Sequence, residues 1–537
     1  MISEQLKVEV LDWIKHDPDK HTAKQLSEWL KQENEVELKR CFNGFLQFGT
    51  AGLRGPLGPG PSCMNRAVVS RTASGISQFM KKNNLTSVVI GRDARYGSME
   101  FAKDSAEIFS GSGFKTYVLP RELPTPVLAF AVKKLKADVG IMVTASHNPA
   151  TDNGYKVYLG GKVKNIIYAG SQIVAPIDEE ISAEISKSNL SPTRSTVFEI
   201  VPESIIDEYV STVAKLATKP NNLKIVYTPL HGVGAEIFTK VLSKAHFNNP
   251  ILVAEQIKPD PDFPTTKFPN PEESGVMDLA ISYAMKSNAD LVIANDPDAD
   301  RCAIAVKNNK GIWRTVRGDE VGIALGNYLV HTQDLKNKSF ANSLVSSSLL
   351  GVISKRNKIN FQETLTGFKW ISKVPNLAFG YEEALGYCVD PLNVNDKDGI
   401  SAAVVIAQLI DELNLQGKYF DDYLDEIGSE FGFYVTDQIS IRFKDLQQID
   451  ITLNRIVNNP PSEILGSKIE TFENLSESKE MKTPGLRLKY AGGIRVIIRP
   501  SGTETKLKCY IEVVRSNKNE SFLLVSQIKE VLTKVLS

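Results

Sequence analysis

The stretch VGIMVTASHNP, Val139 to Pro149, begins as an apolar strand and ends in a loop of small and polar residues. Its first part, Val139–Val143, is apolar throughout, as expected for a strand in the interior of a sheet. In open α/β sheets, ligands gather outside the carboxyl ends of the strands. The sequence therefore places the Ser146 hydroxyl, close behind this strand, where a reactive group would lie. The same hydroxyl could instead cap local backbone groups.

Similar apolar segments recur along the chain and alternate with segments of helical period. Strands are predicted at 87–90, 115–119, 139–143, 224–228 and 291–294, and helices at 126–135, 235–245 and 278–284. This alternation predicts α/β layering with mostly parallel strand pairing. The pattern restarts near residue 224 and again after 311, so units of one architecture are expected. The N-terminal 40 or so residues have the pattern of amphipathic helices.

The last part of the chain has its own strands and helices and should form a separate domain. Strands are predicted near 435–443, 486–490, 493–499 and 507–514, followed by a helix from Glu520. The predicted fold is therefore three similar α/β domains with mixed, largely parallel sheets, plus a smaller C-terminal α+β domain. The predicted domains are 1–205, 206–311, 312–425 and 426–537. A chain of 537 residues is too long for a single hydrophobic core, which agrees with several domains.

The composition is that of an ordinary globular protein, with 42% hydrophobic and 23% charged residues. The 63 basic and 63 acidic residues balance, which argues against a nucleic-acid or membrane surface as the main partner. The N-terminus lacks the apolar core of a signal peptide, and no run reaches the roughly 18 apolar residues of a membrane span. The five cysteines are scattered, so we expect reduced core residues in a cytoplasmic protein.

A group of acidic residues follows the apolar strand predicted at 291–294. In NDPDADRC, the carboxylates of Asp296, Asp298 and Asp300 occupy every second position, which favours a Mg²⁺ site because this ion prefers oxygen ligands. A calcium-binding EF-hand is disfavoured, since the loop has Arg301 and Lys307 where that motif requires glycine and glutamate. Arg301 could bind a phosphate beside the metal.

A lysine lies shortly after the serine loop. In TDNGYKVYL, Asn153 and Gly154 are expected to form a turn that returns the chain as a strand carrying Lys156 towards Ser146. There the ammonium could stabilise charge or move a proton. The alternative is a solvated lysine on an exposed strand.

Several further loops have the residues of a sugar phosphate site. RPSGTETKLKCY, from Arg499 to Tyr510, offers a guanidinium, hydroxyls and free backbone N–H groups to a phosphate. GFKWIS and GYEEALGY could bind a polyol, the second through Glu382 and Glu383, although either glutamate could face solvent. FGTAGLRG adds a glycine-rich turn and Arg54.

In this order and at these separations, VTASHNP, NDPDADR, GYEEALGY and RPSGTETKLKCY resemble the α-D-phosphohexomutase superfamily, the phosphoglucomutases and phosphomannomutases. The resemblance extends from about Phe48 to the C-terminus, and GRDAR at Gly91 to Arg95 also looks like a family stretch. GFKWIS and GYEEALGY are similar to the branch that includes phosphoglucomutase 2 and the phosphopentomutases. The resemblance implies domains around a central cleft and an enzyme that interconverts hexose 1-phosphate and 6-phosphate, with glucose preferred, through a phosphoserine and a bisphosphate.

The resemblance also implies a role for each candidate residue. Ser146 would carry the phosphoryl group, and one Mg²⁺ per chain would be bound by Ser146, Asp296, Asp298 and Asp300. The catalytic residues would be Ser146, Lys156, His147, Arg54 and Arg301. The substrate-binding residues would be Gly367, Phe368, Lys369, Glu382, Glu383, Lys397, Arg499, Ser501, Gly502 and Thr503. Lys156 is the first candidate for the general acid or base, and His147 is the second.

Alternative functions share these motifs. A phosphatase with the same serine would hydrolyse the intermediate, and a non-catalytic protein would only bind the sugar phosphate. Mannose, glucosamine or pentose phosphates could replace glucose phosphate as the substrate, because epimer selectivity depends on loop geometry. The expected partners are a small-molecule sugar phosphate and a sugar bisphosphate activator such as glucose 1,6-bisphosphate, and the expected assembly is a monomer or weak homodimer.

Overall fold

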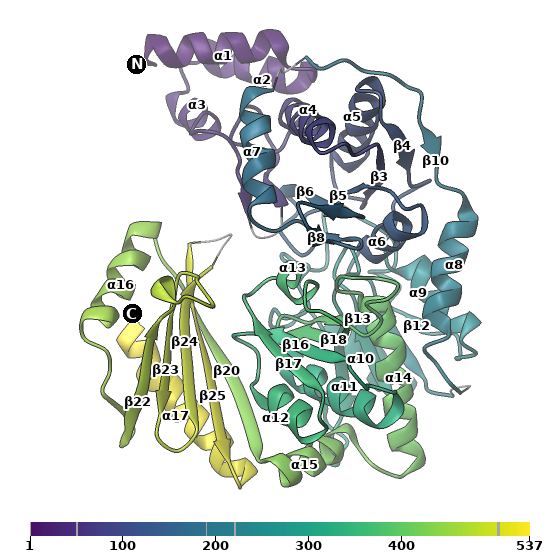
Figure 1. Ribbon diagram of the computed structural model, residues 1–537, viewed down its shortest axis with the longest axis vertical. Helices are drawn as coiled ribbons and strands as arrows, with labels where there is room; N and C mark the ends of the chain where they lie inside the picture. The colour runs from purple at the N-terminus through teal and green to yellow at the C-terminus, as the bar shows by residue number, and fades with distance from the viewer. Residues whose placement is uncertain (1, 50–51, 189–190, 220–221, 502–504, 537) are drawn as a thin grey trace. The chain divides into compact units, whose positions relative to one another are not determined.

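The chain divides into two compact units (Figure 1). The computed structural model describes residues 2–49, 52–188, 191–219, 222–501 and 505–536. The first unit comprises Met1–Val306 and Gly386–Asp411, and the second comprises Lys307–Leu385 and Glu412–Ser537.

Three amphipathic helices open the first unit, as predicted. They are α1 (Glu4–His16), α2 (Lys20–Lys31) and α3 (Glu35–Cys41). Each begins at a polar residue whose side chain accepts a hydrogen bond from a backbone N–H of the first turn, namely Ser3, Asp19 and Asn34. Trp13 and Leu26 are buried on their apolar faces.

The first sheet contains the apolar strand Val139–Val143, which precedes Ser146. Its order is β1-β2-β6-β5-β3-β4-β10, with β9 paired to β6. The strands are β1 (Phe48–Gly49), β2 (Gly52–Pro56), β3 (Ser87–Arg92), β4 (Lys115–Val118), β5 (Val139–Val143), β6 (Asp152–Leu159), β9 (Ser171–Gln172) and β10 (Glu199–Ile200). Strands β5, β3, β4 and β10 pair in parallel, whereas β6, β2 and β1 pair antiparallel, so the predicted mixed sheet is confirmed.

Helices cover this sheet and bury β5 completely. They are α4 (Arg66–Lys82), α5 (Ser98–Gly111), α6 (Thr125–Lys134) and α7 (Ile177–Lys187). Every residue of Val139–Val143 is buried, because helices α5 and α6 pack on the sheet (Figure 1). A short hairpin of β7 (Lys162–Val163) and β8 (Ile166–Ile167) follows β6. The carboxyl end of β5 is thereby held rigidly at the edge of a packed layer.

The turn after the serine loop lies earlier than the sequence predicts. Asn153 and Gly154 are part of strand β6, which pairs antiparallel with β5 and brings Lys156 opposite Met142. Gly154 is needed there for close approach of the two strands, since a Cβ at this position would lie 2.5 Å from the Thr144 carbonyl oxygen. The prediction of a turn at Asn153 and Gly154 was wrong, but the returning strand is present.

A second sheet in the first unit has the order β12-β11-β13-β14. Its strands are β11 (Ile225–Thr228), β12 (Ile251–Leu252), β13 (Leu291–Ala294) and β14 (Ala303–Lys307), and its helices are α8 (Glu203–Ala214), α9 (Ala235–Lys244) and α10 (Asp278–Ser287). Strand β19 (Gly386–Cys388) also belongs to the first unit, and α14 (Gly399–Leu415) begins in it. Strands β12, β11 and β13 are parallel, and β14 runs antiparallel to β13, so the acidic loop at 295–302 joins two neighbouring strands.

The second unit contains one more parallel arrangement and an antiparallel sheet. Strands β16 (Ser339–Ser343), β17 (Asn360–Thr364) and β18 (Leu377–Glu382) pair in parallel in the order β17-β16-β18. The accompanying elements are β15 (Trp313–Thr315), α11 (Gly318–Thr332), α12 (Leu349–Arg356), α13 (Phe368–Ile371) and α15 (Phe420–Phe431). The GFKWIS segment, predicted as a loop, contains the short helix α13.

The C-terminal part is α+β, as predicted. Its six-stranded sheet has the order β20-β25-β24-β23-β22-β21 and is antiparallel. The elements are β20 (Phe433–Arg442), α16 (Leu446–Asn458), β21 (Glu463–Ile464), β22 (Ser467–Asn474), a short 3-10 helix (Leu475–Glu477), β23 (Leu486–Tyr490), β24 (Ile494–Pro500), β25 (Lys506–Arg515) and α17 (Lys518–Leu536). Helix α17 packs along β20 and β25 (Figure 1). Strand β22 was missed because it is mostly polar and only partly buried.

Two expectations from composition can be compared with this fold. The five cysteines are free and buried, as expected for reduced core residues. Among the residues that the structure describes, no helix is both long and apolar enough to cross a membrane.

A buried carboxylate in the second unit makes its stability depend on pH. Asp319, in the first turn of α11, accepts hydrogen bonds from Ser347 N at 2.7 Å and Tyr381 Oη at 2.9 Å. Burial, which disfavours the charged form, raises the pKa of Asp319 to about 7. The folded state therefore holds this proton more tightly than the unfolded state, and stability is lost as the pH rises from about 4 to about 7.

We expect Asp319→Asn to stabilise the protein more at pH 8 than at pH 5. The amide oxygen can still accept both hydrogen bonds, while the cost of ionising a buried carboxylate is removed. The free energy of unfolding is measured by urea titration at each pH. The value for wild type should fall below that for Asp319→Asn, by a difference that grows by at most about 1.4 kcal/mol per pH unit up to about pH 7. An equal effect of Asp319→Asn at both pH values would contradict this account of Asp319.

Candidate active site

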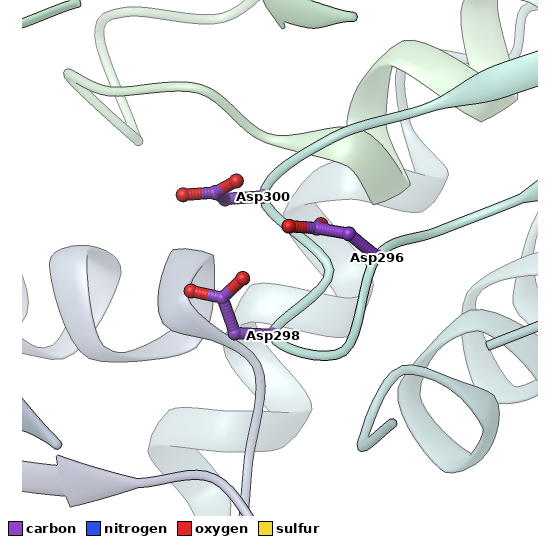
Figure 2. A group of neighbouring side chains, drawn as sticks. All are labelled: Asp296, Asp298 and Asp300. Carbon is purple, nitrogen blue, oxygen red and sulfur yellow. The ribbon is translucent and has the colours of Figure 1, made fainter. Parts of the chain in front are cut away.

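Three aspartates form a buried acidic group in the first unit. Asp296, Asp298 and Asp300 follow β13, and each is at most 1% exposed. One carboxylate oxygen from each lies within 4.8 Å of the others. Figure 2 shows the three carboxylates on the same side of one loop. The left-handed backbone of Ala299, with φ 55°, bends the chain between the second and third ligand positions.

The donor set fits a divalent cation that prefers oxygen ligands. Burial, followed by repulsion from Asp298 and Asp300, raises the pKa of Asp296 well above its usual range. Burial also opposes ionisation of Asp298 and Asp300, but the Lys156 ammonium helps to outweigh it and the pKa of each is lowered, so Asp296 is the least compensated of the three. Within the described residues, Asp298 Oδ1 and Asp300 Oδ1 are buried and accept no hydrogen bond. Asp300 Oδ1 also lies 3.9 Å from Arg301 Nε, and carboxylate oxygens at this spacing that accept no hydrogen bond could hold a metal ion.

Ser146 lies directly against the acidic loop. Its Oγ donates to Asp296 Oδ2 at 2.5 Å and lies 3.2 Å from His147 Nδ1. The residue is 2% exposed and has a left-handed backbone with φ 50°. Its N–H donates to Thr144 Oγ1 at 2.9 Å. The loop therefore holds the serine hydroxyl by backbone geometry at the carboxyl end of β5.

Lys156 is buried in the same group and is not a solvated surface lysine. Its Nζ donates to Asp298 Oδ2 at 2.7 Å and to Asp300 Oδ2 at 2.8 Å, and the residue is 3% exposed. Burial lowers its pKa, but the charges of Asp298 and Asp300 outweigh burial, so the pKa of Lys156 is raised. The ammonium is therefore a fixed positive charge between two carboxylates.

Two arginines and a histidine complete the surroundings of Ser146. Arg54, on β2, donates from Nη1 to Asn148 Oδ1 at 2.9 Å. The backbone N–H of Arg301 donates to Asp296 Oδ1 at 3.0 Å, and its Nη1 lies 3.7 Å from Glu272 Oε2. Burial and then the charges of Arg301 and Arg54 lower the pKa of His147 well below its usual range. The imidazole beside Ser146 is therefore neutral.

The structure places Lys397 with this acidic group. Its Nζ lies 3.4 Å from Asp300 Oδ2 and 3.3 Å from Asp396 Oδ1. The side chain passes over Gly386, where a Cβ would lie 2.4 Å from Lys397 Cδ. Lys156 and Lys397 thus approach the same oxygen of Asp300.

The predicted sugar-binding residues are neighbours within the second unit. Glu382 Oε1 accepts a hydrogen bond from Gly367 N at 2.7 Å, and Phe368 and Lys369 follow in α13. Glu383 Oε2 accepts from the hydroxyls of Ser343 and Ser346. The Glu382 hydrogen bond therefore joins the loops GFKWIS and GYEEALGY, whereas Glu383 connects GYEEALGY to the end of β16 and the residues after it.

The predicted phosphate loop begins at the end of β24. Arg499 belongs to this strand, and the N–H of Ser501 donates to Lys506 O at 2.8 Å. Gly502 and Thr503 lie outside the described residues.

Comparisons with known proteins show which family has this combination of elements. Models of the phosphoglucomutase/phosphomannomutase α/β/α domains I, II and III match residues 46–189, 207–311 and 317–429, and the model of the C-terminal domain matches 454–522. A Haemophilus influenzae protein named "Probable phosphomannomutase" is 45% identical over 88% of this chain and 98% of its own length. The chain belongs to the phosphoglucomutase/phosphomannomutase family.

Other relatives in the α-D-phosphohexomutase superfamily are named for different substrates. Human phosphopentomutase is 33% identical over 99% of this chain and 95% of its own, and Staphylococcus aureus phosphoglucomutase is 32% identical over 90% and 92%. A solved phosphoglucomutase/phosphomannomutase family protein from Burkholderia thailandensis matches the fold with a TM-score of 0.68 at 16% identity, covering 91% of this chain and 97% of its own. This mutase therefore has the family's four-domain architecture, and its enzyme class is that of an isomerase that transfers phosphate within a sugar phosphate.

Arg95 of this mutase was not among the predicted site residues, although the segment GRDAR that contains it resembles the family. The residue is 5% exposed, and its guanidinium donates to four backbone carbonyls, those of Ser146, Asn148, Pro149 and Asp152, at 2.6 to 3.1 Å. It thereby fixes both ends of the serine loop. Thr125 was also missed, and its Oγ1 donates to Asp298 Oδ2 at 2.6 Å. No local pattern identifies these contacts, because each depends on the tertiary fold.

We expect Arg95→Met to destabilise the mutase by about 3 kcal/mol, because it leaves buried carbonyls without donors. Turnover should also fall, since the serine loop loses its main support. Urea unfolding measures the first effect and a mutase assay the second. Arg92→Met is the matched control, because Arg92 makes a partly exposed ion pair with Glu122 at 2.9 Å and should cost no more than about 1 kcal/mol. Equal losses in the two variants would refute the supporting role of Arg95.

Proposed function

We propose that this mutase interconverts glucose 1-phosphate and glucose 6-phosphate through phosphoserine at Ser146 and a glucose bisphosphate. The observation that carries the proposal is the position of the Ser146 hydroxyl, 2.5 Å from Asp296 and within a group of buried carboxylates and cations. Phosphoryl transfer depends mainly on positioning and on neutralising charge. The Ser146 surroundings offer both.

The reaction would proceed in two transfers. In the first, the bond between phosphorus and the Ser146 oxygen breaks, and a bond forms between phosphorus and the free hydroxyl oxygen of the sugar monophosphate. The proton of the sugar hydroxyl passes to a base of the enzyme, and the Ser146 oxygen that leaves phosphorus takes up a proton and becomes a hydroxyl again. The bisphosphate then turns end for end, and its other phosphoryl group returns to Ser146. The sugar leaves as the isomeric monophosphate, and the phosphoserine is restored.

Each charged residue of the site has a part in this scheme. Asp296, Asp298 and Asp300 would hold one Mg²⁺ together with the Ser146 oxygen, and this ion would supply Lewis-acid neutralisation of phosphoryl charge. Lys156, Arg54 and Arg301 would neutralise further charge on the transferring group.

Two groups are placed to move the proton. Lys156 Nζ lies between Asp298 and Asp300, and His147 Nδ1 lies 3.2 Å from Ser146 Oγ. We retain Lys156 as the first candidate for the general acid or base and His147 as the second. Comparing the pH dependence of turnover in Lys156→Met and His147→Asn would separate the two.

The remaining predicted residues would bind the rest of the substrate. Glu382 and Glu383 would accept hydrogen bonds from sugar hydroxyls, with Gly367, Phe368 and Lys369 shaping the same site. Arg499, Ser501, Gly502 and Thr503 would grip the phosphate that is not being transferred, and Lys397 would contact substrate from the side of Asp300. The proposed domains remain 1–205, 206–311, 312–425 and 426–537, the enzyme would act as a monomer or weak homodimer, and a sugar bisphosphate such as glucose 1,6-bisphosphate would restore the phosphoserine.

The identity of the sugar is the part of the proposal that most needs a test. Glucose is proposed because the GYEEALGY segment resembles glucose and pentose enzymes more than mannose enzymes, and the relatives named phosphomannomutase and phosphopentomutase make mannose and pentose phosphates the alternatives. The test is a side-by-side assay of glucose 1-phosphate, mannose 1-phosphate and ribose 1-phosphate, each with Mg²⁺ and the matching bisphosphate. Glucose 1-phosphate should give the highest kcat/KM. A higher value for either alternative would overturn the glucose assignment, and release of inorganic phosphate equal to substrate loss would show a phosphatase.

A further inference from the structure

A further buried carboxylate near the three aspartates, that of Asp396, accepts several hydrogen bonds. Asp396 is 2% exposed. Its Oδ2 accepts from Tyr158 Oη at 2.9 Å and from Gln172 Nε2 at 2.8 Å, and its Oδ1 accepts from the backbone N–H of Lys397 at 2.8 Å and lies 3.3 Å from Lys397 Nζ. Burying a charged carboxylate costs free energy, and hydrogen bonds such as these offset that cost.

The two side-chain donors to Asp396 Oδ2 come from paired strands. Tyr158 on β6 lies directly opposite Gln172 on β9 in the sheet register. Lys156 and Tyr158 are two residues apart on β6, so their side chains leave the same face of the sheet. One face of β6 therefore presents a lysine to Asp300 and a hydroxyl to Asp396.

Lys397 connects these two carboxylates. Its Nζ lies 3.4 Å from Asp300 Oδ2, the oxygen to which Lys156 Nζ also donates at 2.8 Å. If Asp300 binds a metal ion, part of its charge is taken by that ion, and its hold on Lys397 weakens. Asp396 still attracts the Lys397 ammonium in that case, because its Oδ1 lies 3.3 Å from Lys397 Nζ, and a lysine side chain is long and flexible enough to need such an anchor.

We propose that Tyr158, Gln172 and Asp396 are positioning residues that hold the Lys397 ammonium beside Asp300 during phosphoryl transfer. This inference rests on the proposed function of the Ser146 site. The role of the three residues is indirect: Tyr158 and Gln172 fix the carboxylate of Asp396, and Asp396 fixes Lys397. Substitution of Tyr158, Gln172 or Asp396 should allow the Lys397 ammonium to move away from the phosphoryl group that is being transferred.

The chain offers a matched pair of substitutions for the test. Tyr158 and Tyr155 lie on the same strand, both are 0% exposed, and Tyr155 Oη donates to Ser105 Oγ at 2.8 Å. Tyr155→Phe removes a buried hydroxyl that bonds outside the Asp396 group. We expect Tyr158→Phe to lower kcat about tenfold, as for loss of a hydrogen bond to a charged group, and Tyr155→Phe to stay within about twofold of wild type.

A double-mutant cycle separates positioning from a purely structural role. If Tyr158 acts through Lys397, the effect of Tyr158→Phe on kcat should disappear in a Lys397→Met background. An unchanged effect in that background would overturn the proposal, as would equal kcat values for Tyr158→Phe and Tyr155→Phe. Asp396→Asn should resemble Tyr158→Phe in direction and exceed it in size, because it removes the charge that attracts Lys397.

A second measurement does not depend on activity and so distinguishes this inference from the proposed function. Lys397 is 8% exposed, and its reaction with an acetylating reagent can be followed by peptide mass spectrometry. We expect Lys397 to be acetylated several times faster in Tyr158→Phe and Asp396→Asn than in wild type or Tyr155→Phe. Equal acetylation rates would overturn the positioning of Lys397 even in an active enzyme. If the two variants show faster acetylation of Lys397 but the wild-type protein has no mutase activity, the proposed function is refuted and the positioning of Lys397 is retained.

Discussion

Ser146→Ala should reduce mutase turnover by about 10⁴-fold, in the range seen when a catalytic nucleophile is removed. The expected cause is loss of the only group proposed to carry the phosphoryl group between the two transfers. The variant should also gain no phosphoryl group when incubated with glucose 1,6-bisphosphate, as measured by intact-protein mass spectrometry. Its fold should be preserved, because alanine fits the space that the small serine occupies.

Ser77→Ala is the matched control for this experiment. Ser77 is a fully buried serine of the same unit, and its hydroxyl donates to the helical carbonyl of Ala73 at 2.8 Å. This control should keep wild-type turnover and should accept a phosphoryl group as wild type does. Turnover of Ser146→Ala close to that of Ser77→Ala would show that another residue is the nucleophile.

Asp298→Asn should reduce turnover by about 10³-fold and should abolish stabilisation of the protein by Mg²⁺. The substitution keeps the size of the side chain and an acceptor for Thr125 Oγ1, which now donates to Asp298 at 2.6 Å. It removes one of three negative charges from the proposed metal site. Thermal unfolding with and without Mg²⁺ measures binding directly, since a ligand that binds only the folded state raises the melting temperature.

Two controls accompany the metal experiment. Treatment of wild type with EDTA should lower turnover to a similar extent, and added Mg²⁺ should restore it. Asp138→Asn changes a carboxylate whose hydrogen bonds go to Thr86 and Ser87, so its response to Mg²⁺ should equal that of wild type. A melting temperature of Asp298→Asn that still rises with Mg²⁺ would place the ion elsewhere.

The local sequence predicted the secondary structure correctly where one continuous segment forms one strand. The apolar strand before Ser146 and the strand before Asp296 were both predicted, because short runs of valine and isoleucine bounded by polar residues have few other solutions in an α/β fold. The turn predicted at Asn153 and Gly154 was wrong, since these residues fit a turn locally but are drawn into β6 by pairing with β5. Tertiary pairing outweighed local preference at that point.

The contacts that sequence patterns did not predict join distant parts of the chain. Tyr158 and Asp396 are 238 positions apart, and Arg95 is 51 positions from Ser146. Neither spacing nor periodicity relates such residues, because only the folded chain brings them together. The types of residue in the loops indicated the chemistry, whereas the supporting side chains became visible through their hydrogen bonds.

The left-handed backbone at Ser146, with φ 50°, limits which amino acid can stand at the position of the proposed phosphoryl carrier. A threonine hydroxyl has comparable chemistry, but a β-branched side chain is strongly disfavoured in this conformation. The main-chain conformation of the loop therefore favours serine over threonine, whatever the reactivity of the two hydroxyls. Evolutionary exchange of serine for threonine at this position would require a redesigned turn as well as a single codon change.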